Sequence, residues 1–253
     1  MKVTRLPGIH HDGNIVLVLG AAGSVLIDAG TSWYQALQVE RVEGLLEGRS
    51  LDRILLTSRR FPVSGGAHHL SEAFGNAPVH IHPEGQAALE TGDFFTTWAN
   101  RFDSDMPPTS SVPVAPDEVF ALGDGEVHAV ALPGHALDGV GYHLPQLSTL
   151  VVGALLPRAD RPTRWDLPGG NLRDLVSSFK AMKALNLKSI VPLQGPAIRG
   201  KTHVKDVLER HLSFFEQAVD NEGNPPASWH RPAPTALWLT PLQPWPLEEQ
   251  EQV

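Results

Sequence analysis

The sequence predicts an α+β protein whose β-sheets are covered by helices. Three short stretches are almost continuously apolar, as expected for strands buried on both faces: Ile15 to Leu19, Ile54 to Leu56 and Leu150 to Val152. Longer stretches with one apolar face predict amphipathic helices at 34–46, 169–185 and 204–219. Elements of these two kinds bury their apolar sides by packing in layers.

The N-terminal half is predicted to begin with a β-meander of three strands at 3–6, 15–19 and 24–28, which leads into the helix at 34–46. A buried strand at 54–57 then runs into a tight loop, and Gly65 and Gly66 open a helix at 67–74. We further predict a strand at 78–82, a helix at 85–101 and a proline-rich loop at 103–116.

The C-terminal half is predicted to start with a hairpin whose strands, 119–122 and 127–132, are joined by Gly123-Asp124-Gly125. A buried strand at 149–153 and the two long helices follow. The helix at 169–185 places Leu172, Leu175, Phe179, Met182 and Leu185 on one face, which is the spacing of a core-facing helix.

Composition excludes several classes of protein. The chain has 253 residues, of which 42% are hydrophobic, so it is long enough for one large domain. It has no cysteine, which removes disulfides and thiolate metal sites. The net charge of −8 argues against general nucleic-acid binding, and no apolar run is long enough to span a bilayer. A cytoplasmic location is the default expectation.

One loop carries the clearest family pattern. The strand ending at Thr57 is followed by Ser58-Arg59-Arg60-Phe61-Pro62-Val63-Ser64-Gly65-Gly66. This frame resembles the metal-binding loop of the metallo-β-lactamase superfamily, Thr-His-x-His-x-Asp-His-x-Gly-Gly. Ser58 and Arg60 stand at the positions of the first two histidines, Pro62 at the aspartate and Val63 at the third histidine. None of these four holds zinc, which binds imidazole, carboxylate or thiolate groups.

Other motifs of the same superfamily recur in the same order. Leu26-Ile27-Asp28-Ala29-Gly30 resembles its Leu-Ile-Asp-x-Gly element, and Pro133-Gly134-His135 resembles its Pro-Gly-His motif. Ala154 stands at the bridging aspartate and Gln194 at the last histidine. The resemblance covers residues 1–222 and implies a four-layer αββα sandwich of two mixed sheets with helices outside.

His135 is therefore the single metal ligand that the resemblance retains, and we predict no metal and no cofactor. The predicted ligand pocket comprises Asp28, Ser58, Arg60, His135 and Gln194. If Arg60 points inward, its guanidinium occupies part of the metal's place, pairs with Asp28 and suits a carboxylate or phosphate ligand. The alternatives are that Arg60 turns to solvent and that Asp28 only caps the next helix or bonds loop amides.

Three functions remain open at this point. The first is a metal-free, non-catalytic protein with a binding or assembly role, which we favour. The second is a hydrolase of an ester, lactone or thioester that uses Ser58 or Ser64 with His135 and an acid, Asp28 or Asp138; no Gly-x-Ser-x-Gly elbow supports it.

The third is a hydrolase with a relocated metal, held by His80 and His82 or by His10 and His11. His68 and His69 are adjacent on a predicted helix, so we expect them to face different directions and not to share a metal.

The segment 223–253 is rich in proline and contains Trp229, Trp238 and Trp245. Because a free tail of this composition would expose apolar area, we expect it to pack on its own domain or on a partner subunit. A homo-oligomer that binds a small anionic ligand, without nucleic acid or membrane partners, is the resulting expectation.

Overall fold

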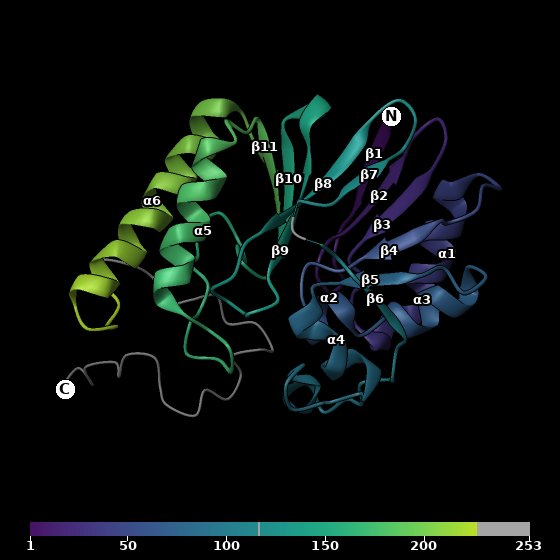
Figure 1. Ribbon diagram of the computed structural model, residues 1–253, viewed down its shortest axis with the longest axis horizontal. Coiled ribbons are helices and arrows are strands. Elements are labelled where there is room, and N and C mark those ends of the chain that lie inside the picture. The colour runs from purple at the N-terminus through teal and green to yellow at the C-terminus, as the bar shows by residue number, and fades with distance from the viewer. Residues whose placement is uncertain (116, 227–253) are drawn as a thin grey trace.

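Two six-stranded sheets face each other in the computed structural model, which describes residues 1–115 and 117–226 (Figure 1). The first sheet has the order β1-β2-β3-β4-β5-β6, with β1 Lys2–Leu6, β2 Ile15–Leu19, β3 Ser24–Ile27, β4 Arg53–Leu55, β5 Val79–Ile81 and β6 Ser111–Pro113. The second has the order β12-β11-β10-β9-β8-β7, with β7 Val119–Ala121, β8 Glu126–Ala131, β9 Val140–Leu144, β10 Thr149–Gly153, β11 Ser189–Pro192 and β12 Ile198–Arg199.

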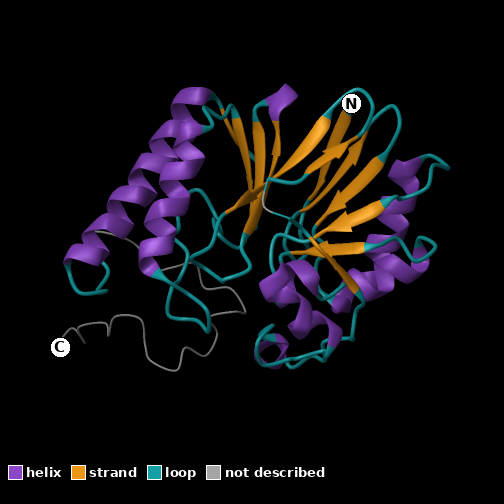
Figure 2. Ribbon diagram, in the orientation of Figure 1, coloured by secondary structure: helices purple, strands orange, loops and turns teal. Residues whose placement is uncertain are grey.

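Helices cover the outer face of each sheet (Figure 2). On the first sheet lie α1 (Gln35–Leu46), α2 (Phe61–Ser64), α3 (Ala67–Ala73) and α4 (Pro83–Glu90). On the second sheet α5 (Leu172–Ala184) and α6 (Lys201–Asp220) pack side by side (Figure 1). The predicted four-layer αββα sandwich is confirmed.

Apolar side chains fill three layers, which explains the continuously apolar strands. In β2, Val16 and Val18 point into the space between the sheets, while Ile15 and Leu17 point toward the helices. A strand at this position needs an apolar residue at every step because both of its faces are buried. On the other side, Leu175 and Phe179 of α5 pack with Phe215 of α6 outside the second sheet.

The structure differs from the predicted elements at several places, among them the end of one helix and two edge strands. The helix expected at 85–101 stops at Glu90, because Gly92 is left-handed (φ 63°) and the Asp93 side chain accepts hydrogen bonds from the amides of Phe95 and Thr96. The short edge strands β6 and β12 were also missed. They have three and two residues, too few to show a period of two.

Both sheets bring the carboxyl ends of parallel strands to one edge of the sandwich. β3 and β4 are parallel, and so are β10 and β11. Gly66 keeps α3 against the end of β3, since a Cβ there would lie 2.4 Å from the carbonyl oxygen of Ala29. Loops that follow such strand ends commonly form binding sites.

Two further expectations concern the location of the protein and its C-terminal segment. No helix in residues 1–115 and 117–226 is both long and apolar enough to cross a membrane. The predicted packing of the proline- and tryptophan-rich segment falls almost entirely on residues 227–253, outside the described residues.

Candidate functional site

The candidate site lies at the sheet edge where four strand-to-loop connections meet. Asp28 follows β3, Ser58 follows β4, His135 follows β8 and Ala154 follows β10. All four residues are at least 95% buried. The structure therefore gathers residues from both sheets at the position that the sequence motifs indicated.

Asp28 ties the end of β3 to the end of β4. Its carboxylate accepts hydrogen bonds from the Thr57 amide (2.8 Å) and the Thr57 hydroxyl (2.9 Å). Burial raises the pKa of Asp28 to about 7, against the opposing effect of these two bonds. The predicted ion pair between Asp28 and Arg60 is wrong, because the Arg60 guanidinium binds backbone carbonyl groups instead.

Arg60 points inward, so the alternative in which it turns to solvent is also wrong. Its side chain is fully buried. The guanidinium donates to the carbonyl oxygens of Thr96 (2.9 Å), Pro168 (2.8 Å) and His135 (3.3 Å), and lies 5.9 Å from the Trp98 ring centre. Burial lowers the pKa of Arg60 to about 10, so the group is still a cation at neutral pH. One side chain thus joins three separate loops.

Asp138 and Arg59 form a second buried charge arrangement that the motifs did not reveal. The Asp138 carboxylate accepts a hydrogen bond from the Arg59 amide (2.5 Å) and lies 3.6 Å from the Arg59 guanidinium. That guanidinium also donates to the Glu84 carbonyl oxygen (2.9 Å). The sequence did carry one signal for this arrangement, namely two adjacent arginines in a loop between buried elements. Because a buried charge needs a partner, such a pair predicts a nearby carboxylate. Asp138, considered above as a triad acid, instead faces Arg59.

His135 is held in one orientation by a hydroxyl that sequence reasoning missed. Its Nδ1 lies 2.8 Å from the Thr163 hydroxyl oxygen, and that hydroxyl donates to the Ala154 carbonyl oxygen (2.9 Å). Because the hydroxyl has one proton, we assign a proton to Nδ1, which also lies 3.2 Å from the Arg164 carbonyl oxygen. Burial lowers the pKa of His135 to about 3, and Arg60 adds to that effect. The imidazole is neutral at pH 7.

Neither candidate nucleophile is hydrogen-bonded to His135 among the described residues. The Ser58 hydroxyl oxygen accepts from the Arg60 amide (3.3 Å). The Ser64 hydroxyl donates toward two backbone carbonyl oxygens, that of Arg59 (2.8 Å) and that of Arg60 (3.0 Å). A serine nucleophile requires a hydrogen bond to its base.

Gln194 lies at the side of the site. Its side-chain amide donates to the His10 carbonyl oxygen (3.2 Å), and it is not among the residues that line the cavity beside His135. The structure thus brings Ser58, Arg60 and His135 together, with Asp28 behind them. Gln194 instead contacts the N-terminal loop.

The two histidine pairs considered for a relocated metal each have other contacts. His80 packs edge-on against Phe120 (5.6 Å between ring centres), and the His82 ring accepts a hydrogen bond from the Glu84 amide. His10 stacks on Tyr34 at 5.8 Å, while His11 packs against aromatic rings at 6.0 and 6.2 Å. Neither pair has a third ligand close enough to form a cluster within residues 1–115 and 117–226.

Little space remains where the superfamily motif would place metal ions. The cavity lined by Ser58, His135 and Ala154 has a volume of about 10 Å³, the space of roughly one water molecule. Its lining offers one imidazole, while Pro62 and Val63 are buried in α2 and Arg60 brings a positive charge. The residues present do not fit a zinc or iron centre.

A larger cavity of about 370 Å³ lies directly outside this closed site. Two of its lining residues, Trp98 and Pro168, also contact the Arg60 guanidinium. The remainder of the lining combines apolar, polar, cationic and anionic side chains: Phe95, Leu167, Asn100, Arg101, Arg164 and Asp166. We call this space the outer cavity.

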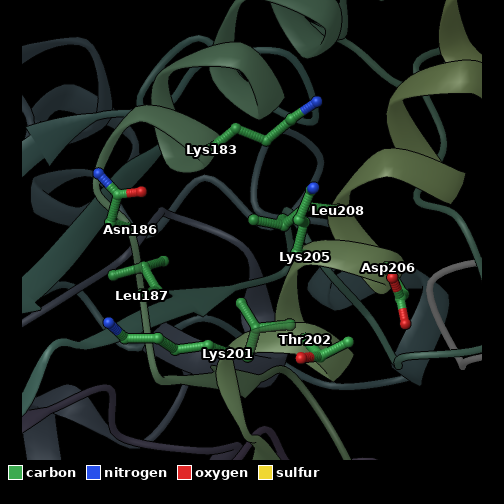
Figure 3. Close-up of a pocket in the computed structure, with 9 residues that line it drawn as sticks. Lys183, Asn186, Leu187, Lys201, Thr202, Lys205, Asp206 and Leu208 are labelled. Carbon is green, nitrogen blue, oxygen red and sulfur yellow. The ribbon is translucent and has the colours of Figure 1, made fainter.

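Another cavity, of about 510 Å³, lies elsewhere, where the end of α5 meets the beginning of α6 (Figure 3). Lys183, Lys201 and Lys205 line it. Lys183 is already paired with Glu209 at 3.2 Å, and Leu187 at its wall precedes β11. It therefore lies at the opposite end of the strands from the candidate site.

Comparison with known proteins agrees with this architecture. Two curated relatives match: an acyl-coenzyme A thioesterase, MBLAC2, of Gallus gallus is 28% identical over 199 residues (70% of this chain, 69% of the relative), and an uncharacterized protein of Aquifex aeolicus is 24% identical over 180 residues (71% and 81%).

Solved structures are also similar. The structure of TTHA1623 in a di-iron-bound form is 27% identical with a TM-score of 0.64 and covers 78% of this chain and 94% of its own. The B3 metallo-β-lactamase BLEG-1 is 19% identical with a TM-score of 0.68, over 81% and 97%, which supports the fold alone. The model of the metallo-beta-lactamase superfamily matches residues 9–194. The chain therefore belongs to the metallo-β-lactamase superfamily.

Proposed function

We propose that this protein is a non-catalytic member of its superfamily that holds no metal ion at the candidate site and binds a small anionic ligand in the outer cavity. The observation that carries the proposal is the position of Arg60. A buried guanidinium bonded to three loops supplies positive charge and cross-linking from the loop position at which the superfamily motif has a histidine. The loops are thereby fixed by the chain itself.

The charges around the site favour an anion. Arg59 and Arg60 are both buried, and Asp138 is the carboxylate that faces them. His135 is neutral, so it adds no positive charge to that of the arginines. In a low-dielectric region, the charge of the Arg60 guanidinium attracts an anion more strongly than it would in water.

The outer cavity offers groups of two kinds for such a ligand. The Arg101 guanidinium lies 5.6 Å from the Trp98 ring centre, and Arg164 lies on the facing loop, where Asp166 is its partner. The Phe95 side chain is 64% exposed at the rim. Arginine suits a carboxylate or phosphate, and the aromatic rings suit an apolar part of the same molecule.

The alternative is a hydrolase of an ester, lactone or thioester. The name of the Gallus gallus relative, an acyl-coenzyme A thioesterase, favours it. In this chain such a reaction would use a non-standard site that includes His135 or Ser58. If the alternative holds, purified protein hydrolyses a short-chain acyl thioester, and His135→Ala or Ser58→Ala abolishes that activity.

The test combines metal content with ligand binding. Untagged protein is analysed for bound metals by mass spectrometry, and benzoate, octanoate and inorganic phosphate are titrated by calorimetry. We expect the metal content to be the same in the parent protein and in His135→Ala. We also expect at least one carboxylate or phosphate probe to bind, more weakly in Arg101→Gln and with unchanged affinity in the surface control Arg199→Gln. A metal ion at full occupancy that His135→Ala removes, or no binding of any probe, would refute the proposal.

A further inference from the structure

We propose that His68, His69 and Glu72 form a surface site for a divalent transition-metal ion, with zinc as its expected occupant. One ligand atom from each residue lies within 4.8 Å of the others. The site is on α3, which lies on the outer face of the first sheet (Figure 1). Among the described residues, it is the one group of three or more potential ligands.

The local helix geometry explains the cluster. Ala67 and Leu70 face the core, so the remaining side of α3 faces solvent. Glu72 lies four residues after His68 and three after His69, and both spacings bring side chains together on a helix. His68 Nε2 is already 3.5 Å from the Glu72 carboxylate, and the two imidazole ring centres are 5.3 Å apart.

This arrangement differs from the expectation that the two histidines face different directions, because their potential ligand atoms lie within 4.8 Å of each other. That expectation considered only their adjacency, which turns successive side chains away from each other. Glu72 reaches both of them, and the two rings meet edge-on.

The chemistry of the ligand set selects the class of metal. Two imidazoles and one carboxylate suit zinc and other late first-row ions, whereas magnesium and calcium prefer oxygen ligands. Bonds of about 2.0–2.1 Å place tetrahedral ligand atoms about 3.4 Å apart, so the exposed side chains must close by about an ångström. His68 and Glu72 are 35% and 61% exposed and are free of core packing, which permits this movement. Water completes the coordination.

The experiment uses untagged, full-length protein stripped of metal with a chelator. Zinc chloride is titrated by calorimetry, and cobalt is added separately to record the visible absorption of a tetrahedral site. We expect one ion per chain, with affinity reduced at least about tenfold in His69→Ala and in Glu72→Gln. Glu72→Gln keeps the shape of an exposed side chain, so it tests the ligand without disturbing the fold.

Two further variants distinguish zinc binding at this surface site from zinc binding at the candidate site beside His135. His203→Ala removes an exposed histidine from α6 and should leave zinc binding unchanged. His135→Ala should also leave it unchanged. Zinc binding that is insensitive to Glu72→Gln and His69→Ala, or no zinc binding at all, would overturn the surface site. Loss of zinc binding in His135→Ala alone would overturn both the surface site and the proposal that the candidate site holds no metal ion.

Discussion

Replacement of Arg60 by methionine tests the central role assigned to its guanidinium. Methionine keeps an unbranched apolar chain of similar length and removes the cation and its donors. The two shorter hydrogen bonds, to Thr96 and Pro168, are each worth about 1.5–3 kcal/mol because the donor is charged. Both contacts are partly buried, so water will replace some of that energy. We expect a loss of about 3 kcal/mol in the free energy of unfolding.

The assay is urea denaturation followed by circular dichroism, with thermal unfolding as a second measure. A loss of this size corresponds to a decrease of about 6–12 °C in Tm for a domain of this length. Arg60→Lys keeps the charge, but one ammonium group cannot reach three separate carbonyls, so we expect roughly half the loss. Arg199→Met, in an exposed position on β12, is the control and should change little. A methionine variant at least as stable as the parent would refute the cross-linking role.

The remaining predictions concern the residues around the same site. Because the folded-state pKa of Asp28 is about 7 and the unfolded value is 3.8, the folded state binds more protons between these values, and stability should fall as pH rises from 4 to 7. Asp28→Asn should reduce this dependence by as much as about 4 kcal/mol, measured by urea titrations at the two ends of the range; an unchanged slope would contradict the assignment. Gly153→Ala should destabilise by about 2–4 kcal/mol, because the residue has a φ of 50° and its Cβ would lie 2.0 Å from the Thr57 hydroxyl oxygen. Gly44→Ala, in α1 with no atom within 4 Å of the new Cβ, should instead stabilise by about 0.5–1 kcal/mol, so equal effects at the two glycines would argue against the contact.

The long elements could be predicted from the sequence because their patterns depend on burial. The apolar residues of β2 and the spaced apolar residues of α5 each report which faces are covered. Short edge strands such as β12 carry too few residues for a pattern. The end of α4 depends on the left-handed Gly92 and on the Asp93 side chain, which accepts a hydrogen bond from the Phe95 amide. The apolar residues after Gly92 keep a helical spacing, so the pattern alone does not reveal this end.

The site was predictable in its position and less so in its contacts. The motif frame placed Ser58, Arg60 and His135 together because strand ends and glycines fix the backbone there. The partners of Arg60 are backbone carbonyls, which every residue carries, so no sequence pattern reveals them. Thr163 was missed for a related reason: it lies in a loop and becomes important only because its hydroxyl reaches His135.

The closed cavity beside His135 has a consequence for the history of the chain. A two-metal centre at this position would require new ligands at several positions and space for two ions, yet the present volume is about 10 Å³. Exchanging Arg60 first would release three loops and lower stability before any ion could bind. Under the proposed function, the packing around Arg60 would thus oppose the first substitution on the way to a metal centre at this position.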